Sequence, residues 1–452
     1  MKLNVENFGK IKSASVELNG YAIFVGDNNS GKSYLMQLVY GLLDAFRYIH
    51  GIGDIPSFHL PTDEKPMVVE QNFLQEYLDA LNAWLEKEKN AIVKKTFNYE
   101  IAIGRIWLSH NESSPVFSMK TAAKSIAASS KESKNDFSRY EFFVGTKSVL
   151  RWGVSNKITQ KHKERVAKDT LCRLIVSHFT SKNVFGDDLL YLPACRSGLN
   201  LLYKEAVGEY ASRDSFMESG DSDSLPPAKK LGLTKPFLDY MLFLMQYKED
   251  EDNEQKNKSL ISFVEKEILK GGHIISKNDE IQYITEDGLK LPLHVSSSMV
   301  NEISPIRLLL SSRNRIKNIF YDEIETSQHP KTQLQLARLL NRLVNAGFKM
   351  IVSTHSDTMA AAISNLVALS FAKDKERKCK VLGYEKDDLL QKDVVHAYQF
   401  IKDEDGRSVV TEIEKFNELG MGYDFSLFSE VSSKLFNDAK IIYGEDDVGS
   451  KC

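Results

Sequence analysis

Several features that would narrow the class of this protein are scarce or missing in its 452 residues. No apolar run approaches the ~18 residues needed to cross a bilayer, and the first residues lack the apolar segment of a signal peptide. The cysteines are far apart and form no C-x-x-C pair, which argues against a zinc site or a disulfide framework. There are four: Cys172, Cys195, Cys379 and Cys452. These absences predict a cytoplasmic protein with no membrane segment.

An excess of either charge is also missing. The 59 basic and 62 acidic residues leave a net charge of −3, so bulk electrostatics gives no reason to expect a nucleic-acid partner. Basic residues do gather locally, and a nucleic-acid partner therefore stays open. The two clusters are Lys161, Lys163, Arg165 and Lys168 on one predicted helix, and Arg313, Arg315 and Lys317 before an apolar strand. Solvated surface is the simpler account of the first cluster, and packing near the nucleotide edge is that of the second.

Hydrophobic periodicity divides the chain into strands and helices that alternate. Short apolar strands are predicted at 22–25, 189–192, 319–321 and 349–353, and helices at 33–46, 68–97 and 332–346. Strand, helix and strand in this order predict a parallel α/β core. Further predictions are strands within 98–109 and 139–153, two helices in 236–270 around a solvated charged turn at 248–258, a hairpin at 273–295, and loops at 120–135 and 213–230.

The segment after the first apolar strand reads Gly26-Asp27-Asn28-Asn29-Ser30-Gly31-Lys32-Ser33, which fits G-x-x-x-x-G-K-[ST] without a mismatch. Its glycines let backbone N–H groups point at phosphate oxygens, Lys32 places a charge on the β- and γ-phosphates, and the Ser33 hydroxyl can bind Mg²⁺. The pattern lies between a strand and a helix, as a phosphate-binding loop requires. It predicts ATP and Mg²⁺ as cofactors. The predicted nucleotide contacts are Gly26, Asn28, Asn29, Ser30, Gly31, Lys32, Ser33 and Tyr34.

A later apolar strand ends in Asp322 and Glu323. A carboxylate there can reach a nucleotide-bound Mg²⁺, so Asp322 is predicted to join Ser33 as a metal ligand. Glu323 is then placed to orient or deprotonate the attacking water. The next strand leads to His355, which comes 33 residues after Asp322 (355 − 322) and can sense the γ-phosphate. Together with Lys32, Glu323 and His355 are the predicted catalytic residues.

These motifs together resemble ABC-type ATPases of the SMC-like branch, and more closely the AAA15/OLD-like ATPases of bacterial anti-phage systems. The resemblance rests on Phe8-Gly9-Lys10-Ile11, on the phosphate-binding loop, on Asp322-Glu323-Ile324-Glu325 with His329-Pro330, and on Ser353-Thr354-His355-Ser356. Ile324 replaces the usual proline. The resemblance implies an α/β fold: an ABC-type P-loop ATPase head, with a mixed sheet, flanking helices, and inserted helical and strand-rich lobes.

The resemblance also gives a meaning to two weaker segments. Ser296, Ser297 and Ser298 are similar to the family's signature motif, which contacts the γ-phosphate of ATP bound to the opposite protomer; read alone, three serines before a helix indicate an N-cap. Arg196, after the strand 189–192, is similar to a family arginine near the nucleotide. A contact to phosphate and a buried structural salt bridge are equal alternatives for it. The Q-loop glutamine has no clear candidate.

The predicted division of the chain follows from these segments. Three ranges are predicted to form the head: 1–50 with the phosphate-binding loop, 189–200 with the strand before Arg196, and 273–375 with the signature, the Asp-Glu pair and the histidine. Two ranges are predicted to be insertions, 51–188 with a helix and strands and 201–272 with helices. Residues 376–452 are predicted to be a carboxyl-terminal segment. No long coiled coil is expected. The run 440–448 looks like the opening of a TOPRIM nuclease domain but is expected to be a disordered acidic tail, so no complete TOPRIM domain is predicted.

Two functions fit this pattern. In the first, ATP is sandwiched in a homodimer or higher oligomer that controls a separate effector protein, a nuclease or a toxin, in antiviral defence. In the second, an SMC-like ATPase acts directly on DNA in repair or remodelling. A plain metabolic kinase leaves Glu323, His355 and the serine cluster unexplained.

Overall fold

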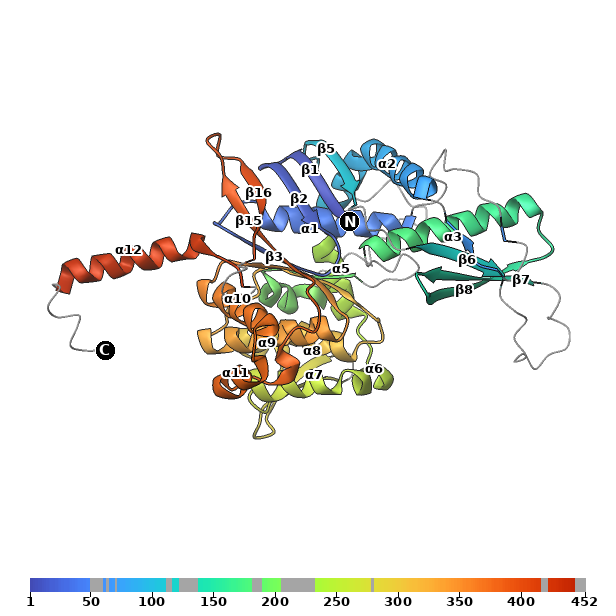
Figure 1. The fold of residues 1–452 in the computed structure, drawn as a ribbon. Helices are drawn as coiled ribbons and strands as arrows, with labels where there is room; N and C mark the ends of the chain where they lie inside the picture. The colour runs from blue at the N-terminus through green and yellow to red at the C-terminus, as the bar shows by residue number, and fades with distance from the viewer. Residues whose placement is uncertain are drawn as a thin grey trace, which may run out of the picture.

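A nine-stranded mixed sheet forms the centre of this protein in the computed structural model, which describes residues 1–48, 60–61, 65–69, 71–110, 116–121, 137–180, 189–204, 232–277, 280–415 and 422–443 (Figure 1). The strand order is β5-β1-β2-β16-β15-β3-β14-β13-β9. The strands are β1 (Lys2–Phe8), β2 (Ile11–Glu17), β3 (Tyr21–Gly26), β5 (Ile103–Ser109), β9 (Leu189–Leu192), β13 (Asn318–Tyr321), β14 (Lys349–Thr354), β15 (Val395–Lys402) and β16 (Ser408–Ile413).

Five neighbouring strands, from β15 through β3, β14 and β13 to β9, pair in parallel. Every residue of β3, β9 and β13 is buried, as in a parallel sheet that is covered on both faces. The remaining part of the sheet is mostly antiparallel, and β1 lies between β2 and β5 and pairs antiparallel with both. The predicted parallel α/β core is therefore confirmed, and it lies within a larger mixed sheet.

Helices cover both faces of this sheet, because alternate side chains of the central strands enter two separate cores. Phe24, Tyr191 and Phe320 pack on one face with α1 (Lys32–Ala45) and α2 (Gln71–Phe97). Ile23, Leu190 and Ile319 pack on the other face. That face is covered by α5 (Lys235–Met245), α7 (Lys258–Phe263), η2 (Val264–Ile268), α8 (Ser298–Ser311), α9 (Pro330–Asn345) and α10 (Asp357–Phe371). Figure 1 shows α1 and α2 on one side of β3 and α8 to α10 on the other.

Two smaller sheets flank the head. A four-stranded antiparallel sheet has the order β4-β6-β7-β8 and packs against α3 (Gln160–Thr180). Its strands are β4 (Met67–Val68), β6 (Phe117–Thr121), β7 (Phe137–Val144) and β8 (Lys147–Ser155). The predicted hairpin at 273–295 is confirmed as β10 (His273–Lys277), β11 (Glu280–Ile284) and β12 (Lys290–Pro292). The predicted loop 213–230, and the part of loop 120–135 from residue 122 on, lie outside the described residues.

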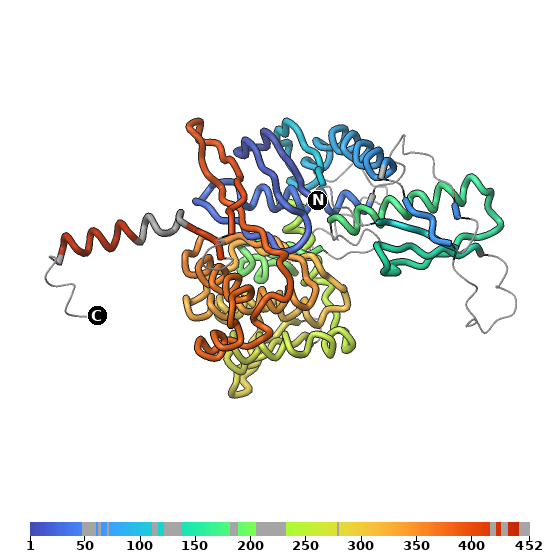
Figure 2. Tube along the Cα trace, in the orientation of Figure 1, coloured from blue at the N-terminus to red at the C-terminus, as the bar shows by residue number. Residues whose placement is uncertain are grey.

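The head is larger than predicted at both of its expected boundaries. Residues 376–452 were expected to form a segment of their own, but β15 and β16 lie inside the central sheet, where β15 pairs with β3 from Val395–Tyr21 to Phe400–Gly26. Figure 2 shows these carboxyl-terminal strands beside the amino-terminal ones. Likewise α2 and β5 belong to the head, although 51–188 was predicted to be an insertion, because β5 pairs with β1 and α2 packs on α1.

Two local predictions are also wrong. The charged run 248–258 was expected to be a solvated turn, yet it contains α6 (Glu251–Lys256), because the Asp250 side chain caps the helix by accepting from the Asn253 N–H at 2.8 Å. The run 440–448 was expected to be disordered, yet its first residues end helix α12 (Ser426–Tyr443). The rest lies outside the described residues.

The remaining helical elements are short or project from the head. They are η1 (Phe46–Tyr48), η3 (Leu293–Val295), α11 (Lys375–Leu382) and η4 (Lys386–Asp388). Helix α12 extends away from the body of the molecule (Figure 1). Among the described residues, no helix is both long and apolar enough to cross a bilayer.

Candidate functional site

The three sequence motifs meet at one edge of the sheet. Lys32 and Asp322 are 290 positions apart in the chain (322 − 32). They are brought together because β3, β14 and β13 are adjacent and parallel, so that the segments following them leave from the same edge. Ser33 Oγ lies 3.1 Å from Asp322 Oδ1, and Lys32 Nζ lies 3.4 Å from His355 Nδ1. The structure therefore assembles the predicted phosphate, metal and sensor residues into one site.

The loop Gly26–Ser33 has a backbone that only glycine permits at its two ends. Gly26 and Gly31 have positive φ angles of 153° and 96°. A Cβ on Gly26 would lie 2.9 Å from the Cβ of Phe400 in β15, and one on Gly31 would lie 3.2 Å from Ile11. The carboxyl-terminal strand β15 thus packs against the start of the phosphate-binding loop.

Lys32 closes this loop on itself. Its Nζ donates to the carbonyl oxygens of Gly26 and Asp27, both at 2.9 Å, and to Ser30 Oγ at 3.3 Å. Burial lowers the pKa of Lys32 to about 8, although Asp322 and Glu323 oppose the shift. An arriving triphosphate would offer this buried ammonium stronger, charged acceptors than two carbonyl oxygens.

We expect Lys32→Ala to lower kcat/KM for ATP hydrolysis about a hundredfold, because one preorganised charged phosphate contact contributes on the order of 3 kcal/mol. Equilibrium binding of a fluorescent ATP analogue, measured beside phosphate release, would check it. Lys10→Ala is a matched control, since Lys10 is an exposed lysine outside the loop. Wild-type turnover in Lys32→Ala would remove the assignment of this loop.

Asp322 is buried and held by three hydroxyl groups. Its Oδ1 accepts from Ser33 Oγ at 3.1 Å and from Ser353 Oγ at 2.6 Å, and its Oδ2 accepts from Tyr191 at 2.9 Å. A hydroxyl beside a carboxylate is the oxygen donor set that suits Mg²⁺, which takes one or two protein oxygens and completes its shell with phosphate and water. The residues present therefore fit the predicted ion, with Ser33 and Asp322 as the groups that would hold it.

Glu323 occupies a strained backbone conformation. Its φ of 46° is in the left-handed region, which costs a non-glycine residue on the order of 1 kcal/mol. Its N–H donates to Ser353 Oγ at 2.8 Å, and its carbonyl accepts from Thr326 Oγ1 at 2.8 Å and from Arg196 at 3.1 Å. These contacts hold the strained residue, and its side chain is aimed at the surface, where it is 38% exposed.

The carboxylate of Glu323 faces the sensor histidine. Its Oε1 lies 3.4 Å from His355 Nε2, and the hydrogen bond with His355 lowers the pKa of Glu323. A deprotonated carboxylate is the form that can accept a proton from water. His355 is positioned in turn by Glu325, whose Oε1 accepts its backbone N–H at 2.5 Å.

Arg196 forms a buried structural salt bridge, which was one of its two predicted roles. Its guanidinium is fully buried and pairs with Glu302 of α8 at 2.5 Å. It also donates to the carbonyl oxygens of Pro193 at 2.8 Å, Asp322 at 2.6 Å and Glu323 at 3.1 Å. The predicted phosphate contact is corrected, because the side chain has no surface to offer a nucleotide. It binds the backbone that carries the Asp322 and Glu323 side chains.

The serine cluster begins helix α8. Ser297 is the N-cap, its side chain accepting from the Val300 N–H at 3.4 Å. Ser297 and Ser298 are exposed, whereas Ser296 is half-buried and donates to the Pro292 carbonyl at 3.2 Å. The N-cap interpretation is thus confirmed, and the same N–H-rich helix end faces solvent.

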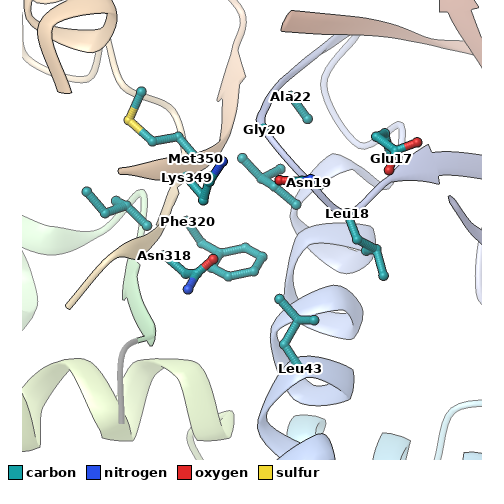
Figure 3. A pocket seen from close by; sticks show the side chains of 12 residues that line it. Glu17, Leu18, Asn19, Gly20, Ala22, Leu43, Asn318, Phe320, Lys349 and Met350 are labelled. Atoms are coloured by element: carbon teal, nitrogen blue, oxygen red, sulfur yellow. The ribbon is translucent and has the colours of Figure 1, made fainter. Parts of the chain in front are cut away.

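A small pocket lies at the other edge of the sheet, between the starts of β3, β13 and β14 (Figure 3). Leu18, Leu43 and Phe320 line it, with Lys349 at its side. The loop Gly26–Ser33 and the pair Asp322 and Glu323 follow the opposite ends of β3 and β13. The cluster Arg313, Arg315 and Lys317 precedes β13 and also lies at this edge, so its predicted place near the nucleotide is wrong.

Sequence reasoning missed three residues of the site's supporting network. Tyr191 and Ser353 orient Asp322, and Gln37 hydrogen-bonds the Tyr191 hydroxyl. Gln37 lies one helical turn after Ser33 on α1, which was a usable signal. Tyr191 was visible only as an apolar residue of a predicted strand.

The fold and the site define a P-loop ATPase head in which one nucleotide face combines a phosphate-binding loop, an Asp-Glu pair and a histidine. The AAA ATPase domain family (AAA_15) matches residues 1–360, and the chain belongs to that family. The expected α/β class with a large mixed sheet and flanking helices is confirmed.

Several solved structures are similar to this chain. One is an SMC head bound to the C-winged helix domain of ScpA, with 11% identity and a TM-score of 0.36, covering 91% of this chain and 96% of that chain. A second is the SMC head domain from Thermotoga maritima, with 12% identity and a TM-score of 0.32, covering 91% of this chain and 98% of that chain. A third is an Smc head domain with an extended coiled coil bound to the C-terminal domain of ScpA, derived from Pyrococcus furiosus. It has 13% identity and a TM-score of 0.33, covering 97% of this chain and 98% of that chain. No curated protein matches.

Proposed function

We propose that this protein hydrolyses ATP to ADP and phosphate in a Mg²⁺-dependent reaction, and that two copies enclose the nucleotide between them. The observation that carries the proposal is the convergence of Lys32, Ser33, Asp322, Glu323 and His355 at one sheet edge. Closure of an active site expels bulk water and so strengthens the electrostatic contacts to the reacting groups. Glu323 and His355 are 38% and 25% exposed, so a second surface is needed to cover them.

The residues of one protomer would divide the reaction among them. Lys32 would exchange its carbonyl acceptors for the β- and γ-phosphates, and Ser33 and Asp322 would hold the ion that neutralises phosphate charge. Water attacks the γ-phosphorus, and Glu323 accepts the water's proton as the bond to the ADP oxygen breaks. His355, whose ring nitrogens lie 3.4 Å from Lys32 Nζ and from Glu323 Oε1, would contact the γ-phosphate.

The partner's contribution would be the amino end of helix α8. Its exposed Ser297 and Ser298 and the free N–H groups of its first turn can receive phosphate oxygens of ATP held by the other copy. Loss of the γ-phosphate would then weaken the interface.

Ser298→Glu tests this arrangement while preserving the fold. A carboxylate at the first turn of a helix stabilises that helix, but it repels a triphosphate brought to the same place. We expect unchanged thermal stability, unchanged ATP binding by the monomer, and loss of both ATP-dependent dimerisation and hydrolysis. Light scattering with ATP and with ADP measures the dimer.

Ser298→Gln is the matched control, since it adds the same bulk without the charge, and it is expected to dimerise with ATP. If Ser298→Glu dimerises and hydrolyses ATP like wild type, the end of α8 does not contact the nucleotide.

We infer further that the ATP state controls a separate effector protein, a nuclease or a toxin, in antiviral defence. The resemblance to anti-phage ATPases supports this inference. A protein partner is also supported by apolar side chains on the projecting helix α12, since exposed apolar clusters are typical of interaction sites. Leu435, Phe436, Ile441 and Ile442 are each more than half exposed. Direct action on DNA is the alternative, and the net positive charge of residues 137–180 supports it.

A further inference from the structure

One projecting part of this acidic protein has a strongly positive net charge: residues 137–180, which comprise β7, β8 and α3 and are called the basic lobe here. It contains nine Lys and Arg residues against three Asp and Glu residues, a net charge of +6 (9 − 3). The whole chain has −3, so all other residues together carry −9 (−3 − 6). A separation of this size within one chain points to a polyanionic partner at the lobe.

Helix α3 carries part of this charge as a stripe. Lys161, Arg165 and Lys168 are spaced i, i+4 and i+7, which places them on one face. Like charges at this spacing destabilise an isolated helix. Lys161 and Arg165 are exposed, and neither pairs with a carboxylate among the described residues. Since neither Lys161 nor Arg165 is paired with a carboxylate in the described part of the chain, this end of the stripe is available to a partner.

The hairpin of β7 and β8 brings further cations to the start of this stripe. Asn156 Oδ1 accepts from Ser138 Oγ at 2.6 Å and from Lys163 Nζ at 2.8 Å, which ties the start of β7, the end of β8 and the first turn of α3 together. The exposed cations next to these anchors are Arg139, Lys157 and Lys161. Three segments of the lobe therefore present positive charge at one corner.

The apolar side of the lobe is already used. Tyr140, Phe142 and Leu171 are buried together between the small sheet and α3, and Trp152 stacks near Tyr140 with ring centroids 5.5 Å apart. Because Tyr140 and Phe142 pack inward, these two rings are not available as a platform for unstacked bases. Apolar side chains are also sparse beside the stripe, which argues against insertion into a membrane surface.

We infer that the basic lobe binds the phosphodiester backbone of duplex nucleic acid. A duplex carries one phosphate charge per ~1.7 Å of its axis, so a stripe about 10 Å long meets several phosphates whatever the base sequence. The lobe projects beside the head, away from α8 and α9 (Figure 1). The inference goes beyond the proposed ATPase function, because binding here requires neither ATP nor a second protomer.

The test is the salt dependence of binding. Fluorescence anisotropy with a duplex of about 30 base pairs, as DNA and as RNA, is measured on the full-length chain between about 50 mM and about 200 mM salt. Wild type is expected to bind with a steep negative slope, and the duplex bound more tightly identifies DNA or RNA. Lys161→Glu/Arg165→Glu is expected to lose at least tenfold in affinity and about 2 units of slope.

Lys258→Glu/Lys266→Glu is the matched control. Both lysines are exposed on α7 and η2, far from the lobe in the sequence, and the change in net charge is the same. It is expected to bind like wild type. The inference is overturned if both double variants weaken binding equally, if wild type shows no salt-sensitive binding, or if polyglutamate displaces the probe as well as unlabelled duplex does. ATP binding by the lobe variant, measured in parallel, keeps this outcome separate from a failure of the ATPase proposal.

Discussion

Glu323→Gln is expected to bind ATP normally and to hydrolyse it about a thousandfold more slowly than wild type. General bases contribute on the order of 10²–10⁴ in rate, and an amide cannot take the proton from water. The substitution keeps the shape of the side chain, so the backbone contacts to Ser353 and Arg196 that hold Glu323 are retained. ATP bound but not hydrolysed would keep two protomers together, so a dimer should accumulate.

Glu325→Gln provides a control from the same motif. Glu325 accepts the His355 N–H, and the amide oxygen of glutamine can accept it equally, so its rate should fall far less. Single-turnover hydrolysis gives the rate, and light scattering gives the mass. If Glu323→Gln hydrolyses ATP slowly but stays monomeric with ATP, the proposed dimer around the nucleotide is contradicted. If it hydrolyses ATP at the wild-type rate, the role of Glu323 as the general base is contradicted.

The residues of the candidate nucleotide site could be predicted because each is encoded locally. The loop Gly26–Ser33 carries its own glycines, lysine and hydroxyl group, and Asp322 and Glu323 follow directly from an apolar strand. Their meeting also followed from the order of strands and helices. A local motif needs only a few neighbouring residues to be recognised, and the parallel sheet then places its strand ends at one edge.

The supporting contacts could not be predicted, since they join residues that are distant in sequence. Tyr191 is 131 positions from Asp322, whose carboxylate it orients. Strand β15 pairs with β3, although most of the chain separates the two strands in sequence, and its Phe400 packs against Gly26. No local feature of Val395–Lys402 indicates that β3 is its partner. Strand pairing is a property of the whole sheet, and this is why the head was predicted to end too early.

The buried pair of Arg196 and Glu302 leads to the other large expected effect. Arg196→Met should lower the free energy of unfolding by about 3–5 kcal/mol, because it leaves the Glu302 carboxylate buried without its cation. It should also impair hydrolysis, because the carbonyl groups of Asp322 and Glu323 lose their donor. Denaturant unfolding and phosphate release measure the two effects on one protein sample.

The double variant Arg196→Met/Glu302→Gln separates the two roles. Glutamine removes the buried charge and keeps an oxygen for the Ser197 hydroxyl, which donates to Glu302 at 2.5 Å, so most of the stability should return. Hydrolysis should stay impaired, because nothing replaces the donors to the strained backbone at Glu323, where φ is 46°. If activity returns with stability, Arg196 only fills the core. If stability returns alone, Arg196 links helix α8, whose first turn is proposed to face the partner's ATP, to Asp322 and Glu323, which are proposed to hold the ion and to accept the proton.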